Sequence, residues 1–308
     1  MQRYRAAMHH GIGIDTSHSI DDIISDVRRA RDAGFSSATC SQIFGYDALT
    51  LLAVVGSHVP DIGLMTAVVP TYPRHPIVLA AQALTVQAAT GGRLTLGIGL
   101  SHQIVIEGMF GHSFDKPARH MREYLSALMP LLDGEQVNVQ GETLKAFTMA
   151  PLEITAPRPQ VLLAALAPVM LKLAGSLTDG TVTWMTGPDT IENHILPKIT
   201  AAATDAGKPS PRIAVALPVC VTNDVDAARA AADKTFAIYG TLPSYAAMIE
   251  KEGASSPGGV AIVGDEESVA AQIRHLDEVG ATEFSGAPFG TRDEIGRTTA
   301  LLADLARA

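Results

Sequence analysis

Cysteines, basic clusters and long apolar runs are all scarce in this sequence, and each scarcity excludes a class of protein. The 308 residues contain two cysteines, Cys40 and Cys220, which lie in separate apolar segments and predict reduced core residues rather than a disulfide or a metal pair. The net charge is −9 without any basic cluster, so neither nucleic acid nor an anionic membrane surface is expected as a partner. No apolar run reaches the ~18 residues of a membrane span.

Residues 1–15 also lack the apolar core of a signal peptide, which leads us to expect a cytoplasmic protein. What the sequence does have is an ordinary globular composition, 47% hydrophobic and 18% charged. One large α/β barrel can absorb a chain of this length, so we expect a single domain over residues 1–308.

The stretch from Asp61 to Gly99 predicts a complete βαβ unit. Two apolar runs, 62–69 and 94–98, flank a helix expected over 77–89. The prolines of the intervening PTYPRHP segment suit a loop and a first helical turn, and Gly91-Gly92 ends the helix. Because both strands are apolar at nearly every position, they are expected to be buried on both faces of a parallel sheet and joined by a right-handed crossover.

The same alternation of strand and helix continues along the chain and predicts a (β/α)8 TIM barrel. The strands are expected over residues 11–14, 35–41, 62–69, 94–98, 160–166, 180–185, 212–221 and 283–287. Insertions are expected after strands 4 and 7. Residues 259–263 also have a strand pattern, and they would replace the eighth strand if they joined the barrel.

In such a barrel the active site lies at the C-terminal ends of the strands. The residues there are small, apolar or hydroxyl-bearing, with one histidine among them. They are Asp15, Thr16, Ser41, Gln42, Thr66, Ala67, Val68, Gly99, Ser101, His102, Ala165, Leu166, Ala167, Thr186, Gly187, Pro288, Phe289 and Gly290. This set contains no carboxylate pair for glycoside hydrolysis, no metal-ligand cluster, no GxSxG elbow and no GxxxxGK[ST] loop, so neither a hydrolase nor a metal site is expected. A hydroxyl-lined pocket suits a flat ring cofactor that carries its own reactivity.

Gly97-Ile-Gly99 lacks the third glycine of a dinucleotide-binding fingerprint. Glycines at these positions are better explained by a close approach of the backbone to a ligand, or by the tightening of a barrel strand.

Five stretches of the sequence carry a resemblance to a known family. They are TAVVPTYPRHP at 66–76, LAAQALTVQAATGGRLTLGIGLSH at 79–102, VLLAALAP at 161–168, DGTVTWMTGP at 179–188 and GDEESVAAQI at 264–273. Over nearly its whole length the chain resembles the bacterial luciferase-like flavin and deazaflavin oxidoreductases, and most closely their coenzyme F420-dependent branch.

The resemblance implies a non-proline cis peptide bond between Ala67 and Val68, beneath the deazaflavin ring. It implies that the cofactor binds across the neighbouring strand ends, with the phosphate at backbone amides of a helix N-terminus. The residues implied around the ring are Ser41, Gln42, Thr66, Ala67, Val68, Gly99, Leu100, Ser101 and His102; those implied at the phosphate are Ala165, Leu166 and Ala167, assisted by Thr186 and Gly187.

One departure from the family concerns its glucose-6-phosphate dehydrogenases, which place a histidine after strand two and a glutamate after strand four. Here Ser41-Gln42 and His102 occupy those neighbourhoods, which argues against a sugar-phosphate oxidation. His102 is instead a candidate catalytic proton donor in a reduction, because imidazole titrates near neutral pH.

The expected function is therefore an F420-dependent oxidoreductase that transfers a hydride between deazaflavin C5 and a small organic substrate. Segments 103–116, 135–159 and 240–258 are expected to shape the substrate pocket, with Tyr239 and Tyr245 flanking a lid. Two alternatives stay open: an FMN-dependent two-component monooxygenase, and a cofactor-binding protein with little turnover. The family resemblance also leads us to expect a homodimer.

Overall fold

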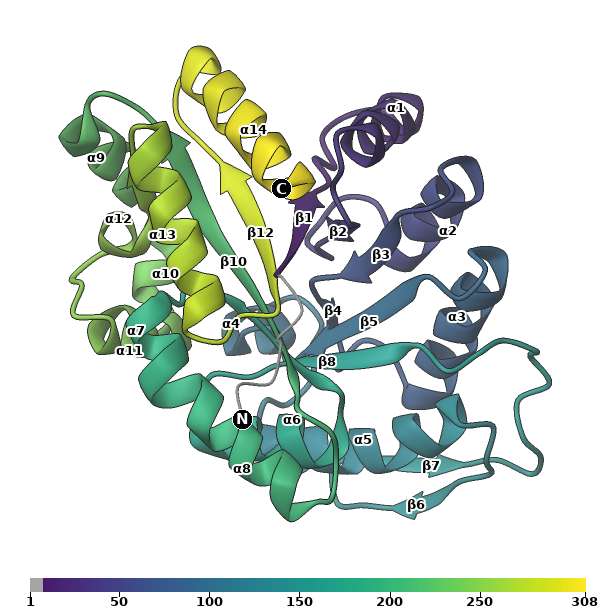
Figure 1. The fold of residues 1–308 in the computed structure, drawn as a ribbon. Helices are drawn as coiled ribbons and strands as arrows, with labels where there is room; N and C mark the ends of the chain where they lie inside the picture. Colours follow the sequence, from purple (N-terminus) through teal and green to yellow (C-terminus); the bar gives the residue numbers. More distant parts are fainter. Residues whose placement is uncertain (1–7) are drawn as a thin grey trace.

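Eight parallel strands close into a barrel, which confirms the (β/α)8 prediction (Figure 1). The computed structural model describes residues 8–308; residues 1–7, part of the stretch searched for a signal peptide, lie outside the described residues. Around the barrel the strands are β1 (His9–Gly13), β2 (Ser37–Cys40), β3 (Gly63–Thr66), β5 (Leu94–Gly99), β8 (Gln160–Ala164), β9 (Gly180–Trp184), β10 (Arg212–Val221) and β12 (Glu283–Pro288). Pairing of β10 with both β9 and β12 closes the ring.

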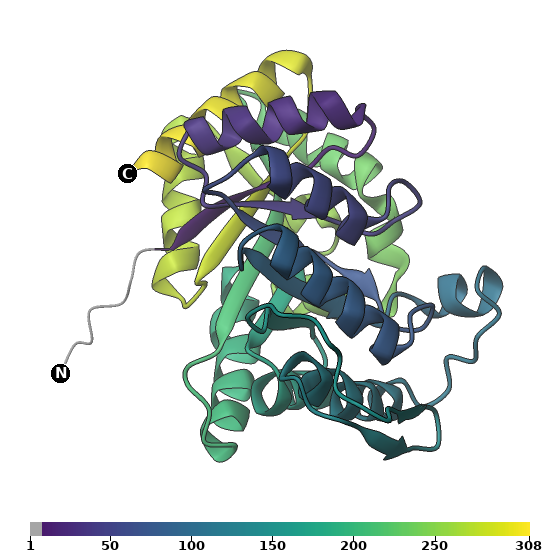
Figure 2. The same cartoon turned by 90° about the vertical axis from the view of Figure 1, so that its right-hand side faces the viewer.

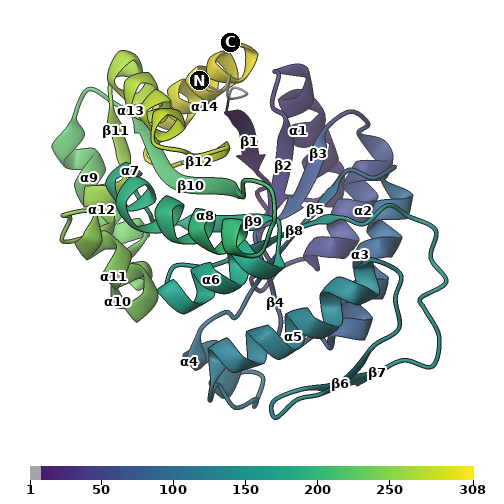
Figure 3. The same ribbon diagram turned by 60° about the horizontal axis from the view of Figure 1, so that its bottom comes forward.

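The helices lie outside this ring of strands, as Figure 3 shows. They are α1 (Ile20–Asp32), α2 (Ala48–His58), α3 (Pro76–Ala89), α4 (Gln103–Gly108), α5 (Pro117–Leu132), α6 (Pro168–Leu177), α7 (Pro188–Thr190), the π-helical turn η1 (Ile191–Ile195), α8 (Leu196–Asp205), α9 (Val225–Thr235), α10 (Ala237–Thr241), α11 (Pro243–Lys251), α12 (Pro257–Val260), α13 (Glu266–Glu278) and α14 (Arg292–Arg307). On one flank α1, α2 and α3 lie side by side (Figure 2).

The predicted βαβ unit is present as β3, α3 and β5. His75 caps α3 by accepting a hydrogen bond from the Ile77 amide at 3.3 Å, and Pro76 is the first helical residue. Gly91 and Gly92 follow the helix with φ of +64° and +85°, a backbone conformation that glycine adopts without steric cost. The local sequence signals therefore set both ends of this helix.

The third strand is shorter than predicted. The expected run of 62–69 is split into β3 and the two-residue β4 (Val69–Pro70), which pairs with the end of β5. The interruption falls at Ala67 and Val68, whose peptide bond is cis, as the family resemblance implied.

The eighth strand is β12, as predicted. Residues 259–263, the alternative for this strand, do not take its position in the barrel. Residues of that segment form α12 and then β11 (Ile262–Gly264), which pairs with β10 at 219–221, beyond the part of β10 that pairs with β9. Two predicted helices are also divided: 189–206 becomes α7, η1 and α8, and 224–239 becomes α9 and α10.

The insertions occupy different positions around the barrel. Segment 135–159 forms the hairpin β6 (Asn138–Gln140) and β7 (Lys145–Phe147), whose turn binds the Glu123 carboxylate on α5. Figure 1 shows this hairpin on the outer side of α5. No helix within residues 8–308 is both long and apolar enough to cross a membrane.

Candidate active site

The centre of the candidate site is the interruption between β3 and β4. The Ala67 amide donates to the Cys40 carbonyl on β2 at 2.8 Å, and the Ser41 hydroxyl donates to the Ala67 carbonyl at 2.7 Å. The Gln42 amide in turn donates to the Val68 carbonyl at 3.3 Å. These bonds hold the end of β2 against the interrupted strand, so four of the predicted ring-binding residues are brought together.

On the other side, the interruption packs on the two glycines of β5. Thr66 exchanges two hydrogen bonds of 2.8 Å with the Gly97 backbone, one to its carbonyl and one from its amide. A Cβ at Gly97 would lie 1.9 Å from the Thr66 carbonyl oxygen, and a Cβ at Gly99 would lie 2.8 Å from a Val68 methyl group. The glycine pair therefore serves the close approach of β5 to the interrupted third strand, which corresponds to the second explanation offered from the sequence, the tightening of a barrel strand.

The loop after β5 carries two polar side chains that make no hydrogen bond within residues 8–308. Ser101 has φ of +60°, in the left-handed region, and His102 is the N-cap residue of α4 without a side-chain capping bond. Within residues 8–308 neither the Ser101 hydroxyl nor the His102 ring has a hydrogen-bond partner. Leu100 packs against the core instead. Burial lowers the pKa of His102 below its ordinary value, because the charged imidazolium loses hydration.

Gln42 has a structural function besides its place at the strand end. Its side-chain oxygen accepts a hydrogen bond from the Ala48 amide at 2.9 Å, at the start of α2, and another from Arg74 at 3.4 Å. Arg74 also pairs with Asp47, the N-cap residue of α2. The side chain of Gln42 is thus committed to this network, and its backbone is what faces the strand interruption.

The turn between β8 and α6 is the candidate anion site. Ala165 is buried, Leu166 is half-buried, and Ala167 is the N-cap residue of α6. The first intrahelical hydrogen bond runs from the Leu171 amide to the Ala167 carbonyl, so the preceding amides of the turn have no acceptor in the helix. Such a helix N-terminus favours an anion through its exposed N–H groups and its dipole.

A buried histidine supports this turn from η1. His194 Nε2 lies 2.8 Å from the Leu166 carbonyl oxygen, and the Lys198 ammonium lies 3.1 Å from His194 Nδ1. Since an ammonium can only donate, Nδ1 accepts and Nε2–H donates to Leu166. Burial lowers the pKa of His194, and the nearby charges of Lys198 and Lys251 lower it further.

Thr186 and Gly187, the predicted assistants at the phosphate, are both buried. The Thr186 hydroxyl donates to the Trp184 carbonyl at 3.1 Å. Beyond Gly187, the Glu252 carboxylate accepts from the Asp189 and Thr190 amides at 3.1 and 2.8 Å. An acidic side chain of the protein therefore already binds these amides after β9.

A row of aromatic rings follows the strand ends from β5 to β12. Ring centroids are 5.7 Å apart for His102 and Tyr245, 5.1 Å for Tyr245 and Tyr239, and 5.7 Å for Tyr239 and Trp184. Phe236 continues the row at 5.8 Å from Trp184. The sequence predicts that both tyrosines flank a lid. It gives no sign that Tyr245 contacts His102, because 143 residues separate the two.

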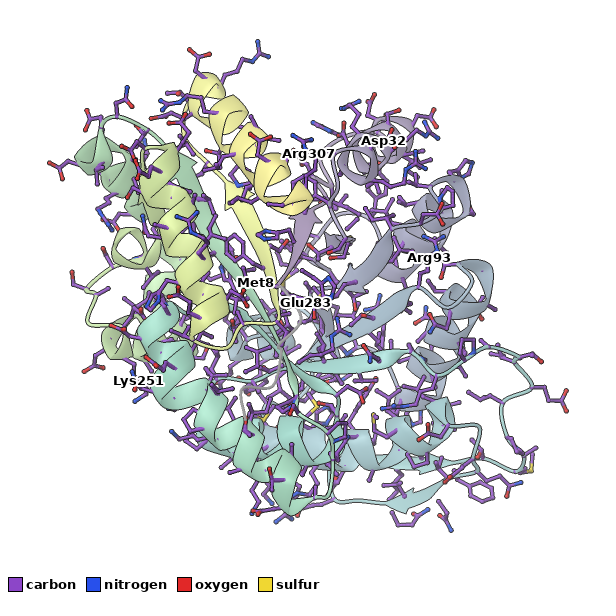
Figure 4. The ribbon with its side chains drawn as sticks, viewed as in Figure 1. Met8, Asp32, Arg93, Lys251, Glu283 and Arg307 are labelled. Carbon is purple, nitrogen blue, oxygen red and sulfur yellow. The ribbon has the colours of Figure 1, made fainter. Side chains whose placement is uncertain are left out.

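A cavity lies at the opposite end of the barrel. Its volume is about 500 Å³, and its lining includes His9, Thr95, Gln160, Arg212 and Glu283, from the N-terminal ends of the strands. Figure 4 shows Glu283 near the point where the strands converge. Among residues 8–308 no three His, Cys, Asp or Glu side chains are grouped as a metal site would require.

Comparison with known proteins adds a family to this geometry. Residues 4–283 match the family model described as luciferase-like monooxygenase. The chain is 26% identical to 5,10-methylenetetrahydromethanopterin reductase of Methanolobus tindarius over 317 aligned positions, which cover 93% of this chain and 96% of that protein.

Two solved structures share the fold. The coenzyme F420-dependent tetrahydromethanopterin reductase of Methanopyrus kandleri superposes with a TM-score of 0.80 at 22% identity, covering 97% of each chain. The oxygenating component of 3,6-diketocamphane monooxygenase from Pseudomonas putida, in complex with FMN, gives 0.73 at 18% identity, covering 96% of each chain.

Proposed function

This chain belongs to the luciferase-like monooxygenase family, and from that premise we propose that it is an F420-dependent oxidoreductase acting on a small organic molecule. The observation that carries the proposal is the meeting of the β3–β4 interruption, the glycines of β5 and the side chains of Ser101 and His102, which make no hydrogen bond within residues 8–308. The coenzyme F420-dependent reductase of Methanopyrus kandleri, which has the same fold along nearly its whole length, supports F420 over FMN. When bound, the deazaflavin supplies the hydride at C5.

The residues of the site fit a flat ring with an anionic tail. Ala67 and Val68 would lie under the ring, with Ser41, Gln42 and Thr66 fixing their position through backbone contacts. Gly99, Leu100 and Ser101 would contact the ring and the hydroxylated chain. The amides at Ala165, Leu166 and Ala167 would hold the phosphate, with Thr186 and Gly187 at the neighbouring strand end.

His102 is the residue we assign to proton transfer. Its ring carries no structural hydrogen bond among residues 8–308, and burial holds its pKa below the ordinary value of 6.5. A neighbouring proton donor is useful in a reduction because the carbon that accepts the hydride leaves negative charge on an adjacent oxygen or nitrogen. The Tyr245 ring packs on one side of the His102 ring, with the ring centroids 5.7 Å apart.

FMN in an oxygen-activating branch is the second candidate, supported by the FMN-containing monooxygenase of the same fold. A titration of the purified protein with F420 and, separately, with FMN distinguishes the two. We expect micromolar or tighter binding of F420, weakened at least tenfold by Ser101→Ala or His102→Ala. Ser113→Ala, on an exposed turn, is the matched control.

Each outcome of that titration, together with an acceptor assay where F420 binds, assigns the protein to one of the candidate functions. Preference for FMN would move it to the oxygen-activating branch, and F420 binding without reduction of any acceptor would make it a carrier of the cofactor. Binding of neither would reject the site at the strand ends.

We also infer that two copies associate through α2 and α3. Neither helix contains Asp, Glu, Lys or Arg, although both lie on the outside of the barrel. On α3 the exposed side chains include Val78, of which 51% is accessible. A helix without a charged outer face is typical of one that is covered by another surface.

A further inference from the structure

The aromatic row beside His102 is built as a wall. Trp184, Phe236, Tyr239 and Tyr245 are partly buried and pack on a buried apolar base. That base consists of Met185, Ile249 and Val260. Successive rings meet edge to face, with interplanar angles of 69° for Trp184 and Tyr239 and 88° for Tyr239 and Tyr245. All four residues stay partly exposed, which leaves some of their surface open to a further contact.

The wall carries no charge that could pair with a charged substrate. The helices that supply the two tyrosines have two charged residues, Glu250 and Lys251, both exposed at the far end of α11. Lys251 lies at the periphery of the molecule in Figure 4. A phosphorylated sugar or an acidic substrate would lose its hydration here without an ion pair in exchange, which is unfavourable.

One carboxylate next to the wall has a different task. Glu252, at the C-terminus of α11, binds the Asp189 and Thr190 amides that follow β9. A side chain at Gly187 would collide with it, since a Cβ there would lie 2.4 Å from the Glu252 carboxyl carbon. Thr190 makes a further contact with α11, 3.5 Å from its hydroxyl to the Met248 carbonyl. Glu252 thereby fixes the helix that carries Tyr245 to the strand that carries Trp184.

We propose that Tyr245 and Tyr239 are the specificity-determining residues of this site, that the substrate is an uncharged, flat molecule stacked on their rings, and that Glu252 is the positioning residue of this wall. The proposal rests on the proposed function, which supplies the cofactor on the opposite side of the substrate. Tyr245 contacts the His102 ring directly, so a molecule lying on Tyr245 is also within reach of the proton donor.

Calorimetric titration with two probes tests the substrate class. Menadione is an uncharged bicyclic quinone, and glucose 6-phosphate is an anion; both are titrated into the protein with and without F420. We expect menadione to bind and glucose 6-phosphate not to bind. Tyr245→Ala and Tyr239→Ala should each weaken menadione binding at least tenfold, whereas Tyr245→Phe, which keeps the ring, should change it less than threefold. Tighter binding of glucose 6-phosphate, or unchanged menadione binding in both alanine variants, would overturn the proposal.

The chain has one tryptophan, Trp184, so its fluorescence reports on the wall without any turnover. Glu252→Ala should at least double the quenching of this fluorescence by acrylamide and weaken menadione binding about tenfold. Glu250→Ala, on the same helix but exposed, is the control and should change neither. Equal quenching in the two variants would refute the role of Glu252. If F420 fails to bind while these results hold, the proposed function fails and the wall stands.

Discussion

The two ends of the barrel differ in how their polar groups are used. At the N-terminal end, Arg212 donates to both oxygens of Glu283 at 2.7 and 2.8 Å, to Thr95 at 3.1 Å, and to Gln160. At the C-terminal end, His102 and Ser101 have no hydrogen-bond partner within residues 8–308 for their side chains. A cavity of about 500 Å³ lies at the first end.

From this difference we infer that the proposed site lies at the end whose polar side chains have no hydrogen-bond partner within residues 8–308, rather than at the end with the cavity of about 500 Å³. A guanidinium has five N–H donors, and Arg212 already uses four of them on neighbouring side chains. Such a network stabilises the fold but offers little to a ligand. At the C-terminal end the backbone stabilises the strand ends, through the glycines of β5 and the hydrogen bonds between the ends of β2 and β3. The side chains of Ser101 and His102 are therefore not needed for that purpose.

The largest effect is expected from breaking the N-terminal network. Arg212→Met leaves the Glu283 carboxylate, 13% exposed, without its partner, and should lower the free energy of unfolding by about 3 kcal/mol. Denaturant unfolding measures this change. F420 affinity should stay within threefold, because the proposed cofactor site lies at the other end.

Two controls sharpen that result. Adding Glu283→Gln should recover part of the loss, since the unpaired charge is then removed. Arg297→Met breaks an exposed ion pair with Glu266 and should leave stability nearly unchanged. A wild-type stability in Arg212→Met would contradict a structural role for this network.

The next effect concerns proton transfer at the C-terminal end. His102→Gln should lower turnover roughly 100-fold, the order expected for loss of a general acid. Because glutamine keeps a hydrogen-bonding side chain at this position, F420 affinity should fall less than in His102→Ala. The donor is the protonated ring, so wild-type turnover should rise as pH falls through the pKa of His102, which burial holds below 6.5. The variant should lack this rise. Stopped-flow reoxidation of reduced F420 by menadione, from pH 5 to 8, provides the measurement; turnover equal to wild type would assign the proton to water.

Much of this architecture follows from local sequence patterns. The apolar runs and the glycine stop around α3 predicted a βαβ unit, and the structure confirms it. The helix N-cap residues follow the same rule: Ser19, Asp47 and Asp224 each accept a hydrogen bond from an amide in the first turn. Such features depend on neighbours within a few residues, which is why the sequence alone suffices.

The parts that could not be predicted join distant segments. Glu252 binds the amide of Asp189 across 63 residues, and nothing near either residue indicates the pairing. The split of the third strand was not predicted, because 62–69 is apolar at nearly every position; the family resemblance implied only the cis peptide bond at which the split falls. Tyr245 meets His102 only because an insertion after β10 crosses the strand ends. Contacts of this kind depend on the closed barrel and have no local signature.

A smaller effect is expected from filling the close approach at β5. Gly97→Ala would place a Cβ 1.9 Å from the Thr66 carbonyl oxygen and 3.2 Å from a Val68 methyl group. Relief requires the strand interruption to move, so we expect F420 affinity to fall about tenfold and the free energy of unfolding to fall by about 1–3 kcal/mol. Gly296→Ala, in α14 with open space around it, is the control and should be neutral or stabilising. Unchanged F420 affinity in Gly97→Ala would separate the interruption from the cofactor site.

The smallest effect is expected on the sides of the barrel, at α3 and α14. On α14, exposed Ile295 is surrounded in sequence by Arg292, Asp293, Glu294 and Arg297, whereas α3 has no charged residue near exposed Val78. If α3 is covered by a second copy, Val78→Glu places a carboxylate in an apolar interface and should raise the dimer dissociation constant about tenfold. Ile295→Glu should leave it unchanged. Light scattering over a dilution series measures the dissociation constant of each variant. A wild-type protein that is monomeric at micromolar concentration would refute the dimer, and the uncharged face of α3 would then be exposed in the monomer.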